Sequence, residues 1–132
     1  MITGLATSGN AMAPASNIEP VVVQEWNYPV LSGSLSIDDN GQCVNYAKVL
    51  SGIYRSGHAI NWSNYINSYA PSLKSVVVFD RSSSVLGHLA VVVKIEDNKI
   101  TISERNYQGP WIISERVLDA NDPSILGYVV AE

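Results

Sequence analysis

The sequence predicts an α+β domain in which helices come first and the strands of an antiparallel sheet follow. Apolar residues recur at helical spacing only before residue 71. From residue 76 onward the apolar segments are short, contain many β-branched residues and are separated by tight turns. This segregation along the chain is typical of α+β proteins, so we expect N-terminal helices packed on an antiparallel β-sheet.

Length and composition indicate one globular domain. The chain has 132 residues, of which 46% are hydrophobic, and this length leaves no room for a second core. Small residues without a period dominate residues 1–16, so we expect a flexible N-terminal arm there and a single domain over residues 17–132. No Lys or Arg precedes Lys48, so the basic region of a secretory signal is not visible. The apolar segment Val21–Leu31 is expected to be a short strand or a wrapping loop.

Charge and hydropathy disfavour two classes of partner. Eight Lys and Arg residues against twelve Asp and Glu give a formal net charge of −4, with too few basic side chains for a phosphate-binding stripe. No apolar run approaches the roughly 20 residues that a membrane-spanning helix needs. We therefore expect neither nucleic-acid binding nor a membrane span.

The first helix is expected to begin near Asp39. Asp39 and Gln42, three residues apart, form a capping-box pattern. Beyond them, apolar residues recur at i, i+4 and i+7, namely Cys43, Ala47 and Leu50. Gly52 is expected to end this helix as a left-handed C′ residue.

A second helix is expected over Trp62–Tyr69. Its aromatic and aliphatic residues recur at i, i+3, i+4 and i+7, namely Trp62, Tyr65, Ile66 and Tyr69. Pro71 is expected to end this helix. We interpret the aromatic stripe as core rather than as a binding surface.

Five strands are predicted after the helices: Val76–Phe79, Gly87–Ile95, Lys99–Arg105, Trp111–Ile113 and Gly127–Val130. If the two-residue turn Asp97-Asn98 joins the second and third strands, Glu96 lies opposite Lys99. The numbers of any two directly opposed residues then sum to 195. In that register His88 would lie on the opposite face from Glu104 and Asn106. A three-residue loop with a left-handed Asn98, or a bulge, changes the sum to 194 and brings the three side chains to one face. The register with the sum of 194 also places Ile100 and Ile102 on the face of His88 and leaves the more polar residues of the third strand on the other face. We therefore predict an odd-length loop or a bulge.

Four residues could form the site of a cysteine hydrolase. Cys43 lies in the first turn of the predicted first helix, where backbone N–H groups and the helix dipole favour the nucleophilic thiolate. His88 begins the second strand and could be its imidazole partner. Glu104 and Asn106 end the next strand, where an acceptor could orient the His88 ring.

Each of these residues also has a structural interpretation. A lone Cys is most often a small buried hydrophobe, and a His at the start of a strand is most often structural. Glu104 could be a surface carboxylate and Asn106 a turn residue. The order of the four residues along the chain favours the catalytic interpretation. All four occur together in this order by chance much less often than any one of them occurs alone.

Four segments of the chain share the pattern of one known family. They are Gly41-Gln42-Cys43-Val44-Asn45-Tyr46, Gly57-His58-Ala59-Ile60-Asn61-Trp62, Gly87-His88-Leu89-Ala90-Val91-Val92 and Ser103-Glu104-Arg105-Asn106. In this order they resemble the catalytic blocks of CHAP domains, the cysteine- and histidine-dependent amidohydrolase/peptidase family. Two departures occur: His58 stands where the family usually has Asn, and Lys74-Ser75 stand where it often has Gly-Asp.

The resemblance implies a papain-like fold that hydrolyses an amide bond of bacterial peptidoglycan through a Cys thioester. By the same resemblance, Cys43 is the nucleophile and His88 is the general base and acid. Glu104 would orient His88, and Asn106 would support or complete the site. His58 is not expected to be catalytic.

Two further residues are expected to contact the substrate. Gln42 would help to polarise the scissile carbonyl, by the same resemblance. Trp111 follows the expected catalytic strand and is expected to line the substrate cleft, with core packing as the alternative. The alternating Asp residues of a calcium loop do not precede Cys43, and the sequence has neither a zinc-helix motif nor a phosphate loop, so we expect no metal and no cofactor.

The sequence leaves several functional alternatives open. The bond could be the N-acetylmuramoyl-L-alanine amide, or a peptide bond of the stem or cross-bridge. The domain could instead be a catalytically silent wall-binding or virion structural module, or a Cys amidase with a non-wall substrate. We expect a monomer whose partner is the peptidoglycan peptide and which acts on the bacterial cell wall, either secreted or delivered by a phage.

Overall fold

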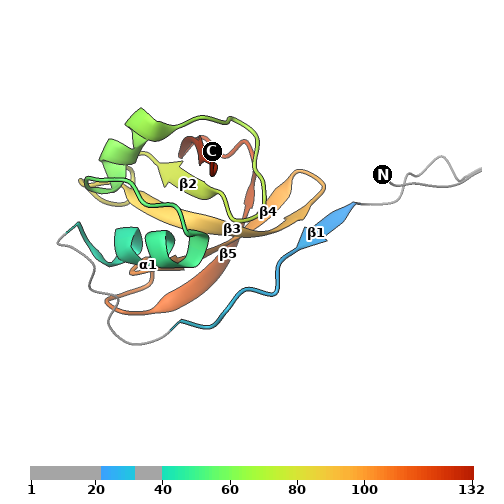
Figure 1. The fold of residues 1–132 in the computed structure, drawn as a ribbon, viewed down its shortest axis with the longest axis horizontal. Coiled ribbons are helices and arrows are strands. Elements are labelled where there is room, and N and C mark those ends of the chain that lie inside the picture. The colour runs from blue at the N-terminus through green and yellow to red at the C-terminus, as the bar shows by residue number, and fades with distance from the viewer. Residues whose placement is uncertain (1–21, 32–39) are drawn as a thin grey trace, which may run out of the picture.

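An antiparallel sheet forms the centre of the molecule, and an α-helix and a 3₁₀-helix pack on it (Figure 1). The computed structural model describes residues 22–31 and 40–132, so the predicted arm at residues 1–16 lies outside the described residues. The described elements are, in chain order, β1 (Val23–Glu25), α1 (Gln42–Ser51), the 3₁₀-helix η2 (Ala59–Tyr65), β2 (Val76–Phe79), β3 (His88–Glu96), β4 (Lys99–Arg105), β5 (Ile113–Asp119) and β6 (Ile125–Val129). The predicted α+β class with an antiparallel sheet is confirmed.

The sheet has the strand order β5-β4-β3-β2-β6, and β3 is its central strand. One edge of β3 is shared between two partners. β2 pairs with residues 88–91 of β3, and β1 pairs with residues 94–96. The segment before α1 is therefore held against the sheet by a short strand, which was one of the two forms expected for it.

Apolar side chains cover both faces of the sheet. On one face, Val44 and Leu50 of α1 pack with Val91 of β3 and with Trp62 of η2. A second cluster contains the buried residues Val77, Phe79, Ala90, Val92, Ile100, Ile102 and Tyr128. Because side chains alternate along a strand, β3 contributes to both clusters and fixes the two layers relative to each other.

α1 begins at Gln42, with Gly41 as its N-cap at φ 107°. The predicted Asp39 N-cap is therefore wrong, and Asp39 itself lies outside the described residues. Gly41 takes the cap because a residue without Cβ adopts this φ without strain. Gly52 ends the helix as predicted: it is left-handed, at φ 77°, and its N–H donates to the carbonyl oxygen of Lys48 at 2.8 Å. In the part of the chain that the structure describes, no helix has the length and apolar character required to cross a membrane.

The second helix is the 3₁₀-helix η2 rather than the expected helix over Trp62–Tyr69. It begins earlier because His58 and Asn61 close its first turn. The His58 N–H donates to Oδ1 of Asn61 at 2.9 Å, and the Asn61 N–H donates to the His58 carbonyl oxygen at 2.9 Å. Trp62 is fully buried, as the core interpretation requires, but Tyr69 is 81% exposed and does not belong to the core.

The predicted strands agree with the structure except for one. β2 and β4 have the predicted bounds, while β3 and β6 are shifted by one or two residues at their ends. The expected strand Trp111–Ile113 is wrong in its first two residues. They belong to a loop, which closes where the Asn106 N–H donates to the carbonyl oxygen of Ile112 at 3.0 Å. β5 starts at Ile113, and its exposed and half-buried residues make no continuous apolar run.

The β3–β4 hairpin combines a two-residue turn with a bulge. Opposed residue numbers beside the turn Asp97-Asn98 sum to 195, and the register shifts at Val93 so that beyond it they sum to 194. The predicted bulge is confirmed and the odd-length loop is not formed. The left-handed residue is Asp97, at φ 58°, rather than Asn98, because a two-residue hairpin turn requires positive φ at its first central position. The bulge sets His88 and Glu104 on one face of the sheet.

The tetrapeptide Ile-Ser-Glu-Arg occurs twice, at residues 102–105 in β4 and at residues 113–116 in β5. The copies pair antiparallel, with each Ser opposite the other copy's Glu and each Ile opposite the other copy's Arg. Because faces alternate along a strand, Glu104 and Arg116 share one face, and Arg105 and Glu115 share the other. β5 therefore brings an arginine to the face that carries Glu104.

Candidate active site

Cys43 lies in the first turn of α1, and its side chain is half-buried. The backbone N–H groups of this turn have no partner within the helix, so the start of α1 attracts negative charge. The Cys43 side chain lies close enough to the imidazole of His88 for a hydrogen bond and a charge interaction that help to raise the pKa of His88. The structure therefore brings together the two residues that the sequence predicts to be nucleophile and base.

His88 is placed by the tight turn that precedes it. Gly87 has φ 82°, and a Cβ built on it would lie 2.8 Å from the backbone nitrogen of Ile60. The Ile60 N–H in turn donates to the Leu86 carbonyl oxygen at 2.8 Å. Only a glycine fits between these two backbones, and the close approach lets β3 begin with the His88 side chain buried, at 5% exposure.

His88 bridges the thiol and a carboxylate. Its Nε2 lies 2.7 Å from Oε1 of Glu104, which leaves Nδ1 for Cys43. Burial opposes charging of the ring, but the hydrogen bonds to Cys43 and Glu104 and the charges of these groups outweigh it and raise the pKa of His88 to about 9. The imidazolium form is therefore stabilised at neutral pH.

Glu104 is fully buried and has a second partner, Arg116. The Arg116 Nε donates to Oε2 of Glu104 at 2.5 Å, and Nη2 donates to Oε1 at 2.9 Å. Burial opposes ionisation of the carboxyl, but hydrogen bonds from His88 and Arg116 and their charges lower the pKa of Glu104 overall. Arg116 was not predicted from the sequence; the repeated tetrapeptide is the signal that could have revealed it.

Two aromatic rings enclose the His88–Glu104–Arg116 chain. The centroids of Phe79 and Tyr107 lie 5.5 and 5.7 Å from that of the His88 ring. The Arg116 guanidinium lies 3.6 Å from the Tyr107 centroid and 5.4 Å from the Phe79 centroid. Both rings thus contact His88 and Arg116 together and limit the access of water to their hydrogen bonds.

Asn106 has a different environment from the one expected. It is left-handed, at φ 73°, and its Oδ1 accepts a hydrogen bond from the Trp111 N–H at 2.7 Å. In the described part of the chain no hydrogen bond joins Asn106 to His88, although both residues lie at the same end of the β3–β4 pair. The side chain supports the loop over residues 106–112.

Trp111 is not a core residue, since 53% of its side chain is exposed. The core-packing alternative is therefore wrong, while the predicted contact with substrate stays a prediction. The Arg105 guanidinium lies 5.2 Å from the Trp111 ring centroid, and its Nε donates to the Trp111 carbonyl oxygen at 3.3 Å. Arg105 and Asn106 together fix both the backbone and the ring of this residue.

Gln42 and His58 lie at the starts of the two helices. Gln42 precedes Cys43 in α1, and its Oε1 is buried without a hydrogen-bond partner in the described part of the chain. His58 precedes η2, and its backbone closes the first turn of that helix. These backbone bonds give His58 a structural place, and the expectation that it is not catalytic stays a prediction.

Exposed apolar side chains lie on both loops beside the site. The loop before His88 carries Val85 and Leu86, and the loop after Glu104 carries Tyr107, Trp111 and Ile112, all at least 43% exposed. The polar groups from Cys43 through His88 and Glu104 to Arg116 are therefore flanked by apolar surface. A site of this kind suits a substrate with both apolar and polar parts.

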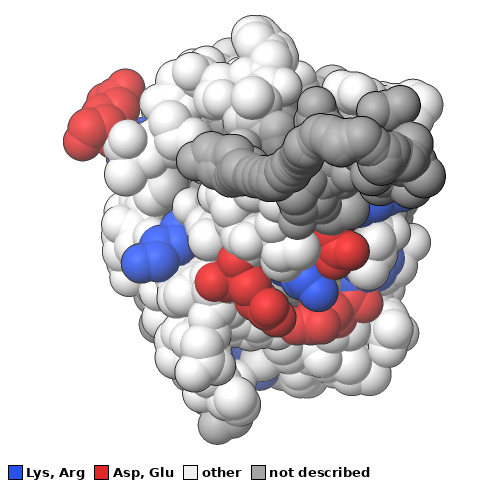
Figure 2. Space-filling view, turned by 90° about the vertical axis from the view of Figure 1, so that its right-hand side faces the viewer, with Lys and Arg blue, Asp and Glu red and all other residues white. Residues whose placement is uncertain are grey.

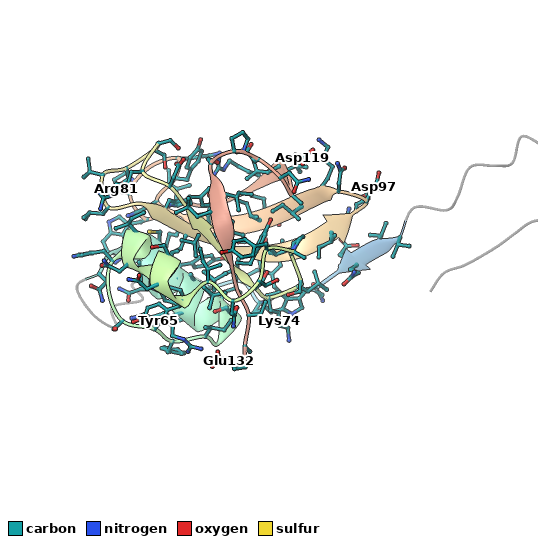
Figure 3. The ribbon with its side chains drawn as sticks, turned by 90° about the horizontal axis from the view of Figure 1, so that it is seen from above. Tyr65, Lys74, Arg81, Asp97, Asp119 and Glu132 are labelled. Atoms are coloured by element: carbon teal, nitrogen blue, oxygen red, sulfur yellow. The ribbon has the colours of Figure 1, made fainter. Side chains whose placement is uncertain are left out.

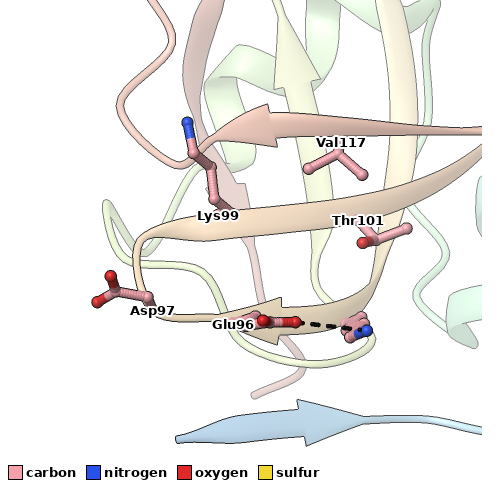
Figure 4. A pocket seen from close by; sticks show the side chains of 6 residues that line it. Glu96, Asp97, Lys99, Thr101 and Val117 are labelled. Atoms are coloured by element: carbon pink, nitrogen blue, oxygen red, sulfur yellow. Dashed lines mark ion pairs between the residues drawn. The ribbon is translucent and has the colours of Figure 1, made fainter. Parts of the chain in front are cut away.

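A hollow lies at the opposite end of the molecule from His88. It has a volume of about 390 Å³ and is lined by Lys94, Glu96, Asp97, Lys99, Thr101 and Val117 (Figure 4). Asp97 and Asp119 lie far from Arg81, which belongs to the loop before His88 (Figure 3). Basic and acidic side chains are mixed at this end (Figure 2), and some form ion pairs, such as Lys94 with Glu96 at 3.5 Å. Across residues 22–31 and 40–132, no cluster of three or more His, Cys, Asp or Glu side chains could hold a metal ion.

Two proteins of Staphylococcus aureus are similar to this chain. An N-acetylmuramoyl-L-alanine amidase domain-containing protein is 34% identical over 87 residues, which cover 58% of this chain and 14% of that protein. The crystal structure of an N-acetylmuramoyl-L-alanine amidase matches with a TM-score of 0.59 and 29% identity, over 72% of this chain and 32% of that one. The chain thus spans only a small part of either relative, and the likeness confirms the papain-like α+β fold.

The family model for the CHAP domain matches residues 35–106. This range contains α1, η2 and the strands β2, β3 and β4, and with them Cys43, His88 and Glu104. Since the match covers more than half of the chain, the protein belongs to the CHAP domain family.

Proposed function

We propose that this domain is a peptidoglycan hydrolase that cleaves an amide bond, with Cys43 as its nucleophile. The observation that carries the proposal is the hydrogen-bonded chain from Cys43 through His88 to Glu104, which α1, β3 and β4 each supply with one residue. A buried imidazole between a thiol and a carboxylate can take the thiol proton and later return it to a leaving group. Family membership and the two similar amidases support the substrate class.

In the first half-reaction His88 moves one proton. Nδ1 takes it from the Cys43 thiol before the substrate reacts, because the raised pKa of His88 favours the imidazolium, and the thiolate sulfur then attacks the carbonyl carbon of the amide to form a carbon–sulfur bond. When the tetrahedral adduct collapses, the carbon–nitrogen bond breaks and the imidazolium gives the proton to the departing amine. The product is a thioester on Cys43 and a neutral His88 ring.

In the second half-reaction water replaces the amine. The His88 ring takes a proton from water as the oxygen attacks the thioester carbonyl, and the carbon–sulfur bond then breaks. The proton returns to the Cys43 sulfur, and the acid product leaves. Glu104 stays ionised throughout, because its task is to hold the Nε2 proton and to stabilise the imidazolium.

Gln42 is proposed to stabilise the oxyanion of the tetrahedral adduct. It is adjacent to Cys43, and its amide carries the N–H donors that a developing negative charge requires. Because its Oε1 has no hydrogen-bond partner in the described part of the chain, the amide is not held in place through that oxygen. The first-turn N–H groups of α1 supply further donors at the same place.

The loop over residues 106–112 is proposed to form one wall of the substrate cleft. Trp111 presents an exposed ring there, and Asn106 supports the site by fixing that loop. The domain is proposed to act as a monomer on the bacterial cell wall, after secretion or phage delivery. The bond is the amide between muramic acid and L-alanine or a peptide bond of the stem or cross-bridge.

Mass spectrometry of digested cell walls tests the proposal and identifies the bond. Purified walls are incubated with the parent protein and with Cys43→Ala, and the soluble fragments are analysed. New free amino groups on L-alanine indicate an amidase, whereas new peptide termini indicate an endopeptidase. No new ends with the parent protein, or equal release with Cys43→Ala, would exclude hydrolysis at this site; wall binding that survives without turnover would then identify a silent wall-binding module.

A further inference from the structure

We propose that Arg116 is a positioning residue that keeps Glu104 ionised and correctly oriented toward His88, an inference that rests on the function proposed above. Within the described residues, Arg116 makes no hydrogen bond to Cys43 or His88, and it acts through the Glu104 carboxylate. Arg116 lies outside the segments of the chain that resemble the family's motifs.

The two oxygens of the Glu104 carboxylate have different sets of hydrogen-bond partners. Oε1 of Glu104 bonds both His88 and Arg116, whereas Oε2 bonds Arg116. Both oxygens are fully buried with the rest of the side chain. Without Arg116, Oε2 would be a buried negative charge without its partner, which is among the most costly arrangements in a protein interior.

The stacking of Arg116 fixes the direction of its donors. Tyr107 lies against the guanidinium at 3.6 Å from centroid to Cζ, and Phe79 lies near it at 5.4 Å. The same two rings flank His88. A planar guanidinium held in this way presents two parallel N–H groups to a carboxylate, which the ammonium of a lysine cannot do.

The consequence for catalysis concerns the tautomer of His88. An ionised Glu104 only accepts hydrogen bonds, so it holds the ring proton on Nε2 and leaves Nδ1 free to accept the thiol proton. A protonated Glu104 would donate to Nε2 and so favour the tautomer that carries its proton on Nδ1. That tautomer cannot take a proton from Cys43. Loss of Arg116 therefore slows the first proton transfer without removing any reacting group.

The repeated tetrapeptide supplies a matched comparison. Glu115 stands in the second copy where Glu104 stands in the first, but it lies on the opposite face of the sheet and bonds the Tyr28 hydroxyl. A change at Glu115 disturbs the same strand pair without touching His88. Arg55 is a second control, since its side chain is 29% exposed and its ion pair is with Glu132.

The first measurement is the alkylation of Cys43 by iodoacetamide, followed by the mass of the intact protein. Cys43 is the sole cysteine, so every added mass reports this thiol. Arg116→Met is expected to slow alkylation at pH 7 by about tenfold or more, and Arg116→Lys by less, because charge is kept and the paired geometry is lost. Glu115→Gln and Arg55→Met are expected to react at the parent rate.

A pH profile separates positioning from a structural effect. The charged groups that face Glu104 are His88 on β3 and Arg116 on β5, and Cys43 on α1 faces His88. Without the arginine, Glu104 takes up a proton at higher pH, so the acid limb of the alkylation profile is expected to move upward in Arg116→Met. A variant that is merely less stable would show a lower rate at all pH values and an unmoved limb.

A double-mutant cycle of Arg116 and Glu104, measured on the turnover of cell walls, is the decisive experiment. Arg116→Met is expected to lower kcat with little change in KM, and to have no further effect when Glu104 is already replaced by Gln. If Arg116→Met does not fold, Arg116→Lys carries the same comparison. Parent-like alkylation and turnover in the folded Arg116 variants, or full additivity with Glu104→Gln, would overturn the inference. A parent without wall turnover but with slowed alkylation in Arg116→Met would reject the proposed function and retain the inference.

Discussion

The side-chain oxygen of Asn106 accepts the backbone N–H of Trp111 at 2.7 Å, and this bond closes the loop between β4 and β5. Both residues have positive φ, 73° and 68°, which is unfavourable for a side chain other than glycine by about 1–2 kcal/mol. The bond offsets part of this strain. The loop that carries the exposed Trp111 ring is therefore held in one shape by the residue that directly follows β4.

Asn106→Ala is expected to loosen this loop and to raise the KM for cell walls more than it lowers kcat. Alanine loses the acceptor and also tolerates positive φ less well than Asn. Asn106→Asp keeps an acceptor at the same place and is the matched control, with a KM near that of the parent. Iodoacetamide alkylation of Cys43 should be unchanged in both variants. A fall in alkylation with Asn106→Ala would instead assign Asn106 to the His88 site itself.

Single substitutions of Cys43, His88 and Glu104 are expected to reduce wall turnover to different degrees. Cys43→Ala and His88→Ala should abolish wall turnover while the domain stays folded, because each removes a group that the proposed mechanism requires to react. Glu104→Ala should keep more residual activity, because it removes a group that orients the ring. Initial rates of wall clearing, with circular dichroism as the check on folding, measure this order. Retained turnover in Cys43→Ala would contradict it.

Stability is expected to fall as pH rises from about 6.5 to about 9. The pKa of His88 is about 9 in the folded protein and about 6.5 when unfolded, so its stabilising contribution is complete below 6.5 and is lost as pH rises through the folded value. The difference corresponds to about 3 kcal/mol. Glu104 acts in the other direction, since its pKa is lowered and its contribution is lost only in acid.

Urea unfolding at pH 6 and at pH 9.5, on the parent and on His88→Asn, measures this contribution. The parent should lose more unfolding free energy between the two pH values than the variant does. Equal losses in the two proteins would show that His88 does not carry the pH dependence.

Gly87→Ala is expected to destabilise the domain and to reduce turnover together. The new Cβ would lie 2.8 Å from the Ile60 backbone nitrogen, and alanine at φ 82° is strained by about 1–2 kcal/mol. Backbone atoms on both sides must shift, and His88 follows directly. Gly52→Ala, also at positive φ but with no atom within 4 Å of the new Cβ, separates strain from collision. Similar losses of stability in the two variants would argue against the close contact.

The sequence was informative where periodicity and turn chemistry agreed. β4 was predicted with the bounds that the structure has, because polar and apolar residues alternate from Lys99 to Ser103. The bulge in the β3–β4 hairpin followed from a register argument, since only an extra residue brings His88 to the face of Glu104. The argument could not choose between turn and bulge, because Asp97 and Val93 carry no local signal for the position of one extra residue.

The sequence was uninformative where contacts between distant segments decide the structure. The Trp111–Ile113 run looked like a strand because it is apolar, yet the bond from Asn106 turns Trp111 into a loop residue. β5 lacks an apolar run, so its strand was missed and Arg116 with it. Arg116 reaches Glu104 only through the pairing of β5 with β4, and the repeat of Ile-Ser-Glu-Arg, rather than any periodicity within residues 113–119, is the sequence signal for that pairing.

The shared edge of β3 has a consequence for shortened forms of the protein. β1 occupies the edge beside residues 94–96, which β2 does not reach. A chain that starts after residue 26 would leave these backbone N–H and C=O groups as a template for a strand from another molecule. Such a form should self-associate at high concentration although Cys43, His88 and Glu104 are all present, whereas a chain that starts at residue 17 should stay monodisperse.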